Sequence, residues 1–468
     1  MSRKTRHSVL RNKLDDMIAG IRNDIESGKL GSGDFLPSEL ELAEKYDISK
    51  HSVRKGLDVL VGQGYVLKIP RVGSKATLPG PKPTTILRFG YYPSMHKQAG
   101  LTGLIKLFHE RHPDIQVELI PVPFKFDELH LMKHYLDAGL IDVAMFNHQS
   151  FAELEESTGV ADILEPLEPE SGIYPFLFKA FQSNNQLFAM PFVFSPVILA
   201  YNKDHFSEYD LPEPDSSWSW DELLRVAGEI GRSNNRVGFY YHALSDNRWP
   251  VFLLQSGEKL RDGATKGLVF NRPAVREAIR MSRDILVTQG LTSLLSQNNA
   301  EAEELFRSGK ISIIMTSYFG LNQFHDAPFR FDIAPLPALQ SADTLNLVIG
   351  LAISSKSIHK EAAKALITEL SSLDFQRLVR SSTLSIPAYK RAAESGREPE
   401  QASPVTEPPR FPLYREIIRS FRLHSEIGLS GEVLKRMRGE LKLYWAGITD
   451  LDTCCKNLEE ALVTKPVG

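Results

Sequence analysis

Residues 35–60 of this chain read FLPSELELAEKYDISKHSVRKGLDVL. Within this stretch Ser38 and Glu41 have the spacing of a capping box, in which a serine side chain caps a helix and a glutamate three residues later reaches back to the serine N–H. The pattern predicts a short helix that begins after the serine and ends near Tyr46. The two residues that follow, Asp47-Ile48, then separate this helix from the next polar cap.

A second helix is predicted in the same stretch, because Ser49 can cap a helix that runs to about residue 64. The apolar side chains on one face would pack against the rest of the domain, and they are Val53, Leu57, Leu60 and Val61. The polar side chains near its start would be exposed, and they are Lys50, His51, Ser52, Arg54 and Lys55. The lysine and arginine side chains alone are equally typical of a solvated helix face. Whether this helix binds DNA therefore depends on the segments that flank it.

The flanking segments predict a further helix and a two-stranded wing. Residues 8–27 form an amphipathic pattern whose apolar members are Val9, Leu14, Ile18, Ile21 and Ile25. Residues 65–69 and 74–78 predict two short strands, with Arg71 and Gly73 in the turn between them. A recognition helix presents polar side chains to base edges in the major groove. A glycine in the wing allows the backbone to approach the minor groove closely.

Residues 8–78 resemble the winged helix-turn-helix head of GntR-type transcription regulators. The matching segments are Phe35–Ala43, Ser49–Leu60, Gly64–Val66 and Arg71–Ser74. The resemblance implies that DNA is bound by Ser38, Glu39, Ser49, Lys50, His51, Ser52, Arg54, Lys55, Arg71 and Gly73. Family members usually carry an arginine directly after the Pro-Ser-Glu triplet, where it touches DNA. This chain has Leu40 there, so that contact is lost or supplied elsewhere.

Charge and composition agree with a DNA-binding head on a larger body. The chain has 468 residues, which is too long for one hydrophobic core and suits two or three domains. Its net charge is -3, yet residues 1–80 hold 14 Lys+Arg against 10 Asp+Glu, so the remainder is acidic. A basic first fifth is typical of a domain that binds nucleic acid.

The cysteine content and the apolar runs predict a cytoplasmic protein without a membrane partner. The only cysteines are the neighbours Cys454 and Cys455, which favours a reducing compartment. No apolar stretch of signal-peptide length follows the basic N-terminus, and no run approaches the ~20 apolar residues that span a bilayer.

Residues 79–85, PGPKPTT, predict a stiff linker between a winged helix-turn-helix domain at 1–78 and an effector domain at 86–468. Strand and helix signals alternate after the linker, in the order 86–92, 100–112, 115–122, 127–139 and 141–146. Further strands are predicted near 187–201, 311–316 and 347–353, and helices near 220–231, 273–289, 300–308 and 358–371. Such alternation favours an α/β fold with a parallel sheet.

Residues 86–390 resemble the family 1 extracellular solute-binding proteins of sugar transporters. The segments that carry the resemblance are 108–117, 141–147, 196–206, 218–227, 305–315, 331–337 and 352–363. The family implies a two-lobed, periplasmic-binding-protein-like α/β domain with a ligand between its lobes. Those proteins are exported, whereas here the fold is joined to a DNA-binding head and is expected to serve as an intracellular sensor.

The resemblance also implies a set of residues that bind a carbohydrate. Sugars are held by aromatic faces and by polar groups that fix their hydroxyls. The positions that match are Tyr92, Ser94, Phe146, Asn147, Trp249, Tyr318 and Gly350. Trp249 is expected to act as an aromatic platform, although each of these residues could equally be part of a core. Trp218 and Trp220 are assigned to structure.

An alternative is a GntR-type regulator with an aminotransferase-like body that holds pyridoxal phosphate on a lysine. Ser354-Ser355-Lys356 superficially resembles that site, but the helix-like SIHKEAAKAL follows instead of a phosphate cup. A transport-binding protein with a misread start is a second alternative, which the complete winged motif disfavours. We therefore expect no enzyme activity, no cofactor and no bound metal. The expected partners are double-stranded operator DNA, a small-molecule effector and a second copy of the chain, because one head reads few bases.

Overall fold

The computed structural model describes residues 3–70, 72–78, 85–122, 128–231, 236–261, 268–288, 296–396 and 406–463. Two compact units make up the chain. One comprises Met1–Thr85 with His109–Gln116, and the other comprises Ile86–Phe108 with Val117–Gly468. Residues 79–84 of the expected linker lie outside the described residues. The first unit is called the head below, for residues 3–78, and the second is called the body.

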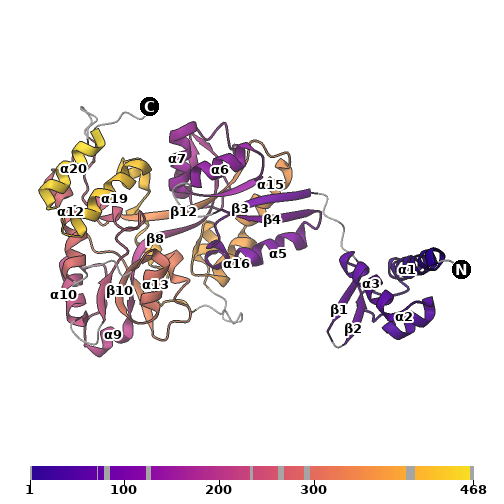
Figure 1. The fold of residues 1–468 in the computed structure, drawn as a ribbon. Coiled ribbons are helices and arrows are strands. Elements are labelled where there is room, and N and C mark those ends of the chain that lie inside the picture. Colours follow the sequence, from indigo (N-terminus) through magenta and orange to yellow (C-terminus); the bar gives the residue numbers. More distant parts are fainter. Residues whose placement is uncertain are drawn as a thin grey trace. The chain divides into compact units, whose positions relative to one another are not determined.

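The head has the three helices and the two-stranded wing that the sequence predicts (Figure 1). Its helices are α1 Arg3–Glu26, α2 Glu39–Tyr46 and α3 Lys50–Gly62. Strands β1 Val66–Ile69 and β2 Gly73–Ala76 pair antiparallel, with Ile69 opposite Gly73. The predicted capping box is confirmed, because Ser38 Oγ accepts from Glu41 N–H and the Glu41 carboxylate accepts from Ser38 N–H at 2.7 Å.

A single apolar cluster holds the head together. Its buried members are Met17, Ile21, Ile25, Leu36, Leu42, Ile48, Val53, Leu57, Leu60, Val66 and Ala76. Helices α1 and α3 approach closely at Gly56, where a Cβ would lie 2.1 Å from Met17 Cε. The turn between α2 and α3 is made by Asp47, whose φ of 49° is left-handed. Because aspartate tolerates this conformation, the turn fixes the angle of α3 without a glycine.

The body is organised around two long antiparallel strands, β8 Met190–Asn202 and β12 Thr344–Ile353, in which every residue is buried. They belong to a 10-stranded sheet whose main order is β4-β3-β5-β12-β8-β10-β9. The other strands of this sheet are β3 Thr85–Tyr91, β4 Ile115–Pro121, β5 Val143–Asn147, β9 Val237–Tyr240, β10 Ile311–Ser317, β11 Phe331–Ala334, β13 Ile386–Pro387 and β14 Phe421–Arg422. A separate hairpin is formed by β6 Gln182–Ser183 and β7 Gln186–Leu187.

The body has two lobes, and strands β8 and β12 run through both of them. Lobe 1 contains β3, β4 and β5, and β5 pairs with the last residues of β12. Lobe 2 contains β9, β10 and β11, and the last residues of β8 pair with β10 and β11. Pairing is parallel between β3 and β5 and between β9 and β10, but antiparallel on both sides of β12. The expected parallel sheet is therefore mixed, because β12 returns from lobe 2 and enters lobe 1 in the opposite direction.

Helices cover the sheet in both lobes (Figure 1). The helices of the body are α4 Met95–Gln98, α5 Leu101–Arg111, α6 Glu128–Asp137, α7 His148–Thr158, α8 Pro175–Phe178, α9 Lys203–Glu208, α10 Trp220–Gly231, α11 Pro250–Gln255, α12 Pro273–Thr288, α13 Asn299–Arg307, α14 Tyr318–Leu321, α15 Lys360–Ser371, α16 Leu373–Ser382, α17 Lys390–Glu394, α18 Leu413–Glu416, α19 Gly431–Trp445 and α20 Leu451–Val463. Three short 3-10 helices are η1 Lys179–Phe181, η2 Ile418–Ser420 and η3 His424–Ile427. The predicted helices near 220–231, 273–289, 300–308 and 358–371 correspond to α10, α12, α13 and α15.

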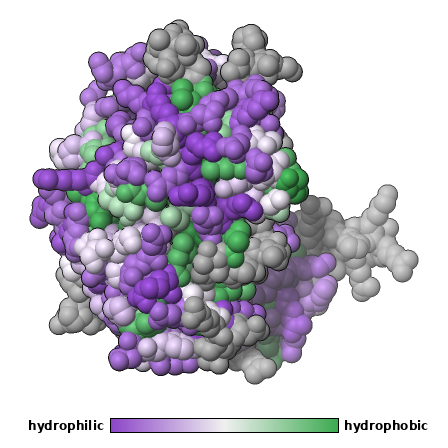
Figure 2. Space-filling view, turned by 90° about the vertical axis from the view of Figure 1, so that its left-hand side faces the viewer, coloured by the Kyte–Doolittle hydropathy of each residue, from purple (hydrophilic) through white to green (hydrophobic). Residues whose placement is uncertain are grey.

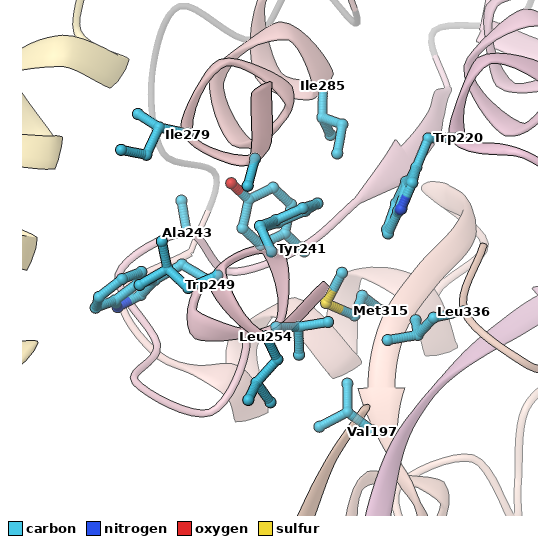
Figure 3. Packing of buried hydrophobic residues seen from close by; sticks show 14 of the residues in the cluster. Val197, Trp220, Tyr241, Ala243, Trp249, Leu254, Ile279, Ile285, Met315 and Leu336 are labelled. Atoms are coloured by element: carbon cyan, nitrogen blue, oxygen red, sulfur yellow. The ribbon is translucent and has the colours of Figure 1, made fainter. Parts of the chain in front are cut away.

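The core of lobe 2 includes the C-terminal helices. Buried side chains of α19 and α20, among them Leu434, Met437 and Leu458, belong to the same cluster as Trp220 and Tyr241. Figure 3 shows part of this cluster, where Tyr241 lies between the α12 side chains and those of α11. The face of the body turned to the viewer in Figure 2 is mainly hydrophilic, with hydrophobic residues in small separate areas. No helix among the described residues is long and apolar enough to cross a membrane.

Candidate DNA-reading face and ligand cavity

The exposed face of α3 carries the predicted DNA-binding side chains. Lys50, His51, Arg54 and Lys55 are exposed and Ser52 is partly buried, while Val53 and Leu57 on the opposite face are buried. Ser49 caps the helix, since its Oγ accepts from Ser52 N–H at 3.1 Å. Because its apolar side chains are buried on the opposite face, the N-terminal half of α3 presents its cations where they could reach base edges in the major groove.

The start of α2 lies beside this face. Arg54 Nε donates to Glu39 Oε2 at 2.8 Å, so two of the predicted DNA-binding residues are paired with each other. Leu40, at the position where the resemblance to GntR-type heads implies an arginine, is 50% exposed. The pair engages Nε of Arg54, and the Glu39 carboxylate offsets part of the positive charge that Arg54 presents on this face.

The wing brings a glycine and an aromatic ring together. Gly73 has a φ of +144°, and a Cβ there would lie 3.5 Å from Phe35 Cδ1. Lys75 Nζ lies 4.8 Å from the centre of the Phe35 ring, which supports the base of the wing. Arg71, the other predicted DNA-binding residue of the wing, lies outside the described residues.

The body contains a cavity of about 720 Å³ whose lining comes from both lobes and from the C-terminal segment. Lobe 1 contributes four of the predicted ligand residues, which are Tyr92, Ser94, Phe146 and Asn147. The Tyr92 hydroxyl accepts from the backbone N–H of Asn147 at 3.2 Å and from its Nδ2 at 3.3 Å. Strands β3 and β5 are parallel, so their carboxyl ends meet at one edge of the sheet and bring these residues together.

The other three predicted ligand residues are not among the described residues that line the cavity. Trp249 is 2% exposed within the core of lobe 2, and Figure 3 shows it among the buried side chains of that cluster. The hydroxyl of Tyr318 donates to Phe411 O at 2.8 Å and accepts from the backbone of Tyr414. Gly350 lies in β12, where a Cβ would lie 2.7 Å from a Phe181 ring carbon.

In this structure the three residues lie in packed surroundings and do not line the cavity, so their part in ligand binding stays a prediction. Trp249 fills a core, because its neighbours are apolar and its Nε1–H is satisfied by Asp246 Oδ1 at 3.2 Å. Tyr318 anchors the chain around Phe411, and Gly350 allows a ring to approach a strand closely.

Lobe 2 contributes polar residues that the sequence analysis did not single out. They are His242, Ser245, Asp246, Asn247, Arg248, Gln297, Asn298, Asn299, Glu303 and Gln323. The run SDNR at 245–248 follows β9, and the run QNN at 297–299 leads into α13, which begins at Asn299. Ligands of α/β folds bind beyond the carboxyl ends of strands and near the starts of helices. Polar residues at such positions could therefore have been predicted from the sequence to line the site.

Buried charges give the cavity its electrostatic character. Arg248 is 3% exposed, and its Nε donates to Met315 O at 3.1 Å, while its guanidinium lies 3.8 Å from the Glu303 carboxylate. Burial lowers the pKa of Arg248 to about 10 and raises the pKa of Glu303, each only partly offset by the other charge. Burial also raises the pKa of Glu153, on α7, to about 7.

The lining of this site is rich in hydrogen-bonding groups. The described residues contain no group of three or more His, Cys, Asp or Glu side chains placed to hold a metal ion. The lining is rich in carboxamides, carboxylates and guanidinium groups, with the rings of Tyr92, Phe146 and Phe319 among them. Such a lining suits a ligand that carries many hydroxyl groups, because each hydroxyl both donates and accepts.

A winged helix-turn-helix head joined to a two-lobed α/β body with a polar cavity defines a class of protein that combines a DNA-binding module with a solute-binding module. The chain belongs to the bacterial extracellular solute-binding protein family, whose model matches residues 92–376. Residues 15–75 match the bacterial regulatory proteins of the gntR family. The family match leaves the aminotransferase-like body without support.

Individual proteins resemble each part. The galactooligosaccharide-binding protein of Bacillus subtilis is 26% identical over 245 residues, which is 49% of this chain and 56% of that protein. The HTH-type transcriptional regulator TreR of Bacillus subtilis is 40% identical over 63 residues, which is 14% of this chain and 26% of that protein. The chain thus spans about half the length, 56%, of the first of these curated relatives.

Solved structures share the fold of the body. A maltose-bound protein of T. maritima superimposes with a TM-score of 0.70 at 20% identity, covering 81% of this chain and 99% of that chain. An ABC substrate-binding protein of Listeria monocytogenes in complex with cycloalternan gives 0.68 at 19% identity, covering 81% and 98%. These similarities establish the two-lobed fold.

Proposed function

We propose that the protein is a ligand-responsive transcription regulator that senses a sugar or oligosaccharide and controls genes of carbohydrate uptake or metabolism. One observation carries the proposal: a polar cavity of about 720 Å³ lies in a body of the solute-binding fold, on the same chain as a gntR-type head. The galactooligosaccharide-binding relative supports a carbohydrate as the ligand. The protein acts in the cytoplasm as a homodimer on an inverted repeat, because one head reads too few bases for useful specificity.

The ligand residues we propose are those that the cavity brings together. Tyr92, Ser94, Phe146 and Asn147 act from lobe 1, while Asp246 and its neighbours act from lobe 2. A ligand that touches both lobes binds best when they are closed, and this difference in affinity is the free energy available to move the protein between states. Couplings of this kind are typically about 1–3 kcal/mol, which changes operator occupancy roughly 5- to 150-fold.

The test uses the full chain in two assays. A thermal-shift screen against mono- and oligosaccharides identifies the effector, and selection from random DNA followed by gel-shift titration gives the operator and its response to that effector. Asn147→Ala is expected to weaken sugar binding and leave the DNA affinity of the free protein intact. The proposal fails if no carbohydrate raises the melting temperature, or if the sugar that does so leaves operator affinity unchanged.

The head is tested by Arg54→Ala, with Lys29→Ala as the matched control in the loop before α2, where Lys29 pairs with Asp24. Losing a contact to a base edge lowers specific affinity roughly 5- to 150-fold, which corresponds to about 1–3 kcal/mol. Glu39→Gln should instead raise affinity, because it removes a negative charge from beside Arg54 on the reading face. Equal operator affinity in the Arg54 variant and the control would remove Arg54 from the reading face.

A further inference from the structure

A segment beyond the residues matched by the solute-binding family model lies against the cavity. This segment, called the strap below, comprises residues 421–438 and contains β14, η3 and the first half of α19. Strand β14 pairs parallel with β12, and Ile427 and Leu429 of the strap belong to the core of lobe 2. One strap residue, Arg438, lines the cavity, whereas His424 is buried behind it.

Two buried histidines connect the strap to both lobes. The backbone N–H of Val348 in β12 donates to His148 Nδ1 at 3.3 Å. His148 Nε2 lies 2.8 Å from His424 Nδ1, and His424 Nε2 lies 2.7 Å from the carbonyl oxygen of Asp246. Because an N–H can only donate and a carbonyl can only accept, both rings must carry their proton on Nε2. The four groups form one directional row of hydrogen bonds.

Burial favours the neutral form of both rings of this row. His148 is 5% exposed and His424 is 3% exposed. Burial lowers the pKa of each imidazole, and the facing histidine lowers that of His148 further. A proton added to either ring would place two donors opposite each other, so the row depends on the neutral state of both rings.

The row joins residues of different lobes. His148 begins α7 in lobe 1, directly after the cap Asn147, and Asp246 lies in the loop after β9 in lobe 2. The Asp246 carboxylate is in turn bound to Arg438 at 2.6 Å. A second link between lobe 1 and the strap is the ion pair of Lys179 with Glu426 at 2.9 Å.

We propose that His424 is a positioning residue of the effector site, which sets the distance between the lobes by joining His148 to Asp246. Both of the residues it joins line the cavity, while His424 itself does not, so its effect on a ligand is exerted through lobe position. The inference rests on the proposed function for one step, the effect of the distance between the lobes on effector binding. Its test needs no effector, and its failure is therefore distinguishable from failure of the proposed function.

The experiment measures the distance between spin labels on the two lobes of the full chain. Ile358, 88% exposed before α15 in lobe 1, and Ile448, 71% exposed after α19 in lobe 2, are replaced by cysteine for labelling. The native thiols Cys454 and Cys455 are fully buried, which keeps the label away from them, and burial raises the pKa of Cys454 to about 12 and that of Cys455 to about 11. Unreactive thiols of this kind can stay in place.

The labelled protein is compared with its His424→Phe variant, which keeps a ring but removes both hydrogen bonds. His205→Phe is the matched control, since His205 is also buried and its ring bonds to Ser312 of the same lobe at 2.8 Å. We expect the His424 variant to shift the distance distribution by more than its wild-type width, and the control to leave it unchanged. A wild-type distribution in the folded His424 variant, or an equal shift in the control, would overturn the inference.

A second measurement covers the case in which His424→Phe does not fold. Nitrogen-15 spectra of histidine-labelled wild-type protein at pH 7 report which ring nitrogen carries the proton. The row requires His148 and His424 to be neutral with the proton on Nε2, assigned by comparison with His148→Phe. A charged ring or an Nδ1–H tautomer at either position would show that the row does not exist.

Discussion

Removing the guanidinium of Arg248 should destabilise the body much more than removing it together with its partner. Arg248 and Glu303 are 3% and 7% exposed, and their charged groups are 3.8 Å apart. In Arg248→Met the side chain keeps its approximate length, but Glu303 remains buried without a cation. Glu303→Gln removes the matching negative charge, so the two changes form a double-mutant cycle.

The expected size follows from this geometry. Two unit charges 3.8 Å apart attract by about 4 kcal/mol at an effective dielectric constant of about 20. Breaking a buried pair from one side typically costs about 3–5 kcal/mol, whereas replacing both members is often close to neutral. We therefore expect Arg248→Met to lose about 3–5 kcal/mol of unfolding free energy, and the double variant to lose clearly less than the sum of the single variants.

The sign of the pH dependence follows from the Glu303 carboxyl. Burial raises its pKa, and without Arg248 that rise is larger. An acid whose pKa is raised in the folded state stays protonated there while the unfolded chain ionises. The additional loss in Arg248→Met should therefore be small below about pH 4.5, near the ordinary glutamate pKa. It should grow as the pH rises above that value.

Urea unfolding followed by tryptophan fluorescence measures this effect. All four tryptophans, at 218, 220, 249 and 445, lie in the body, so the signal reports the body and not the head. The reasoning is refuted if Arg248→Met stays within about 1 kcal/mol of wild type, or if the two single losses add in the double variant.

Three further outcomes are expected. Trp249→Ala should lower the unfolding free energy by about 3–5 kcal/mol, because a buried ring is lost; an unchanged urea midpoint would show that the ring is not core. Burial lowers the pKa of His205 and of His242 to about 4, so the stability present above about pH 6.5 should be lost as the pH falls toward 4, and melting temperatures that stay constant over that range would contradict this. Replacing residues 79–85 with a Gly/Ser segment should preserve sugar and operator binding but uncouple them, which gel-shift titration with and without saturating sugar decides.

The head could be predicted almost completely from sequence because its determinants are local. The capping box joins Ser38 to Glu41, three residues apart, and the cap of α3 joins Ser49 to Ser52. Contacts of this kind form wherever the sequence places the two partners, whatever the rest of the fold does. The ion pair of Arg54 with Glu39 could not be predicted from the sequence, because it depends on the angle between α2 and α3.

Among the residues that line the cavity, those at the ends of strands could be predicted from the sequence. Tyr92 and Asn147 come directly after or at the end of β3 and β5, so strand positions and parallel pairing were enough to bring them together. Trp249 begins a helix with a similar local pattern, but tertiary packing turns its ring into the core of lobe 2. The sequence pattern alone does not show whether a side chain points into the cavity or into the core.

The links between the lobes were decided by tertiary structure alone. His148 and His424 are 276 residues apart, and nothing near either residue in the sequence marks it as half of a pair. The sequence determined which segments become helices, strands and caps, because those preferences act over a few residues. Which distant side chains share a buried hydrogen bond was set by the crossing of β8 and β12, since only the assembled sheet brings the strap against both lobes and removes water from between them.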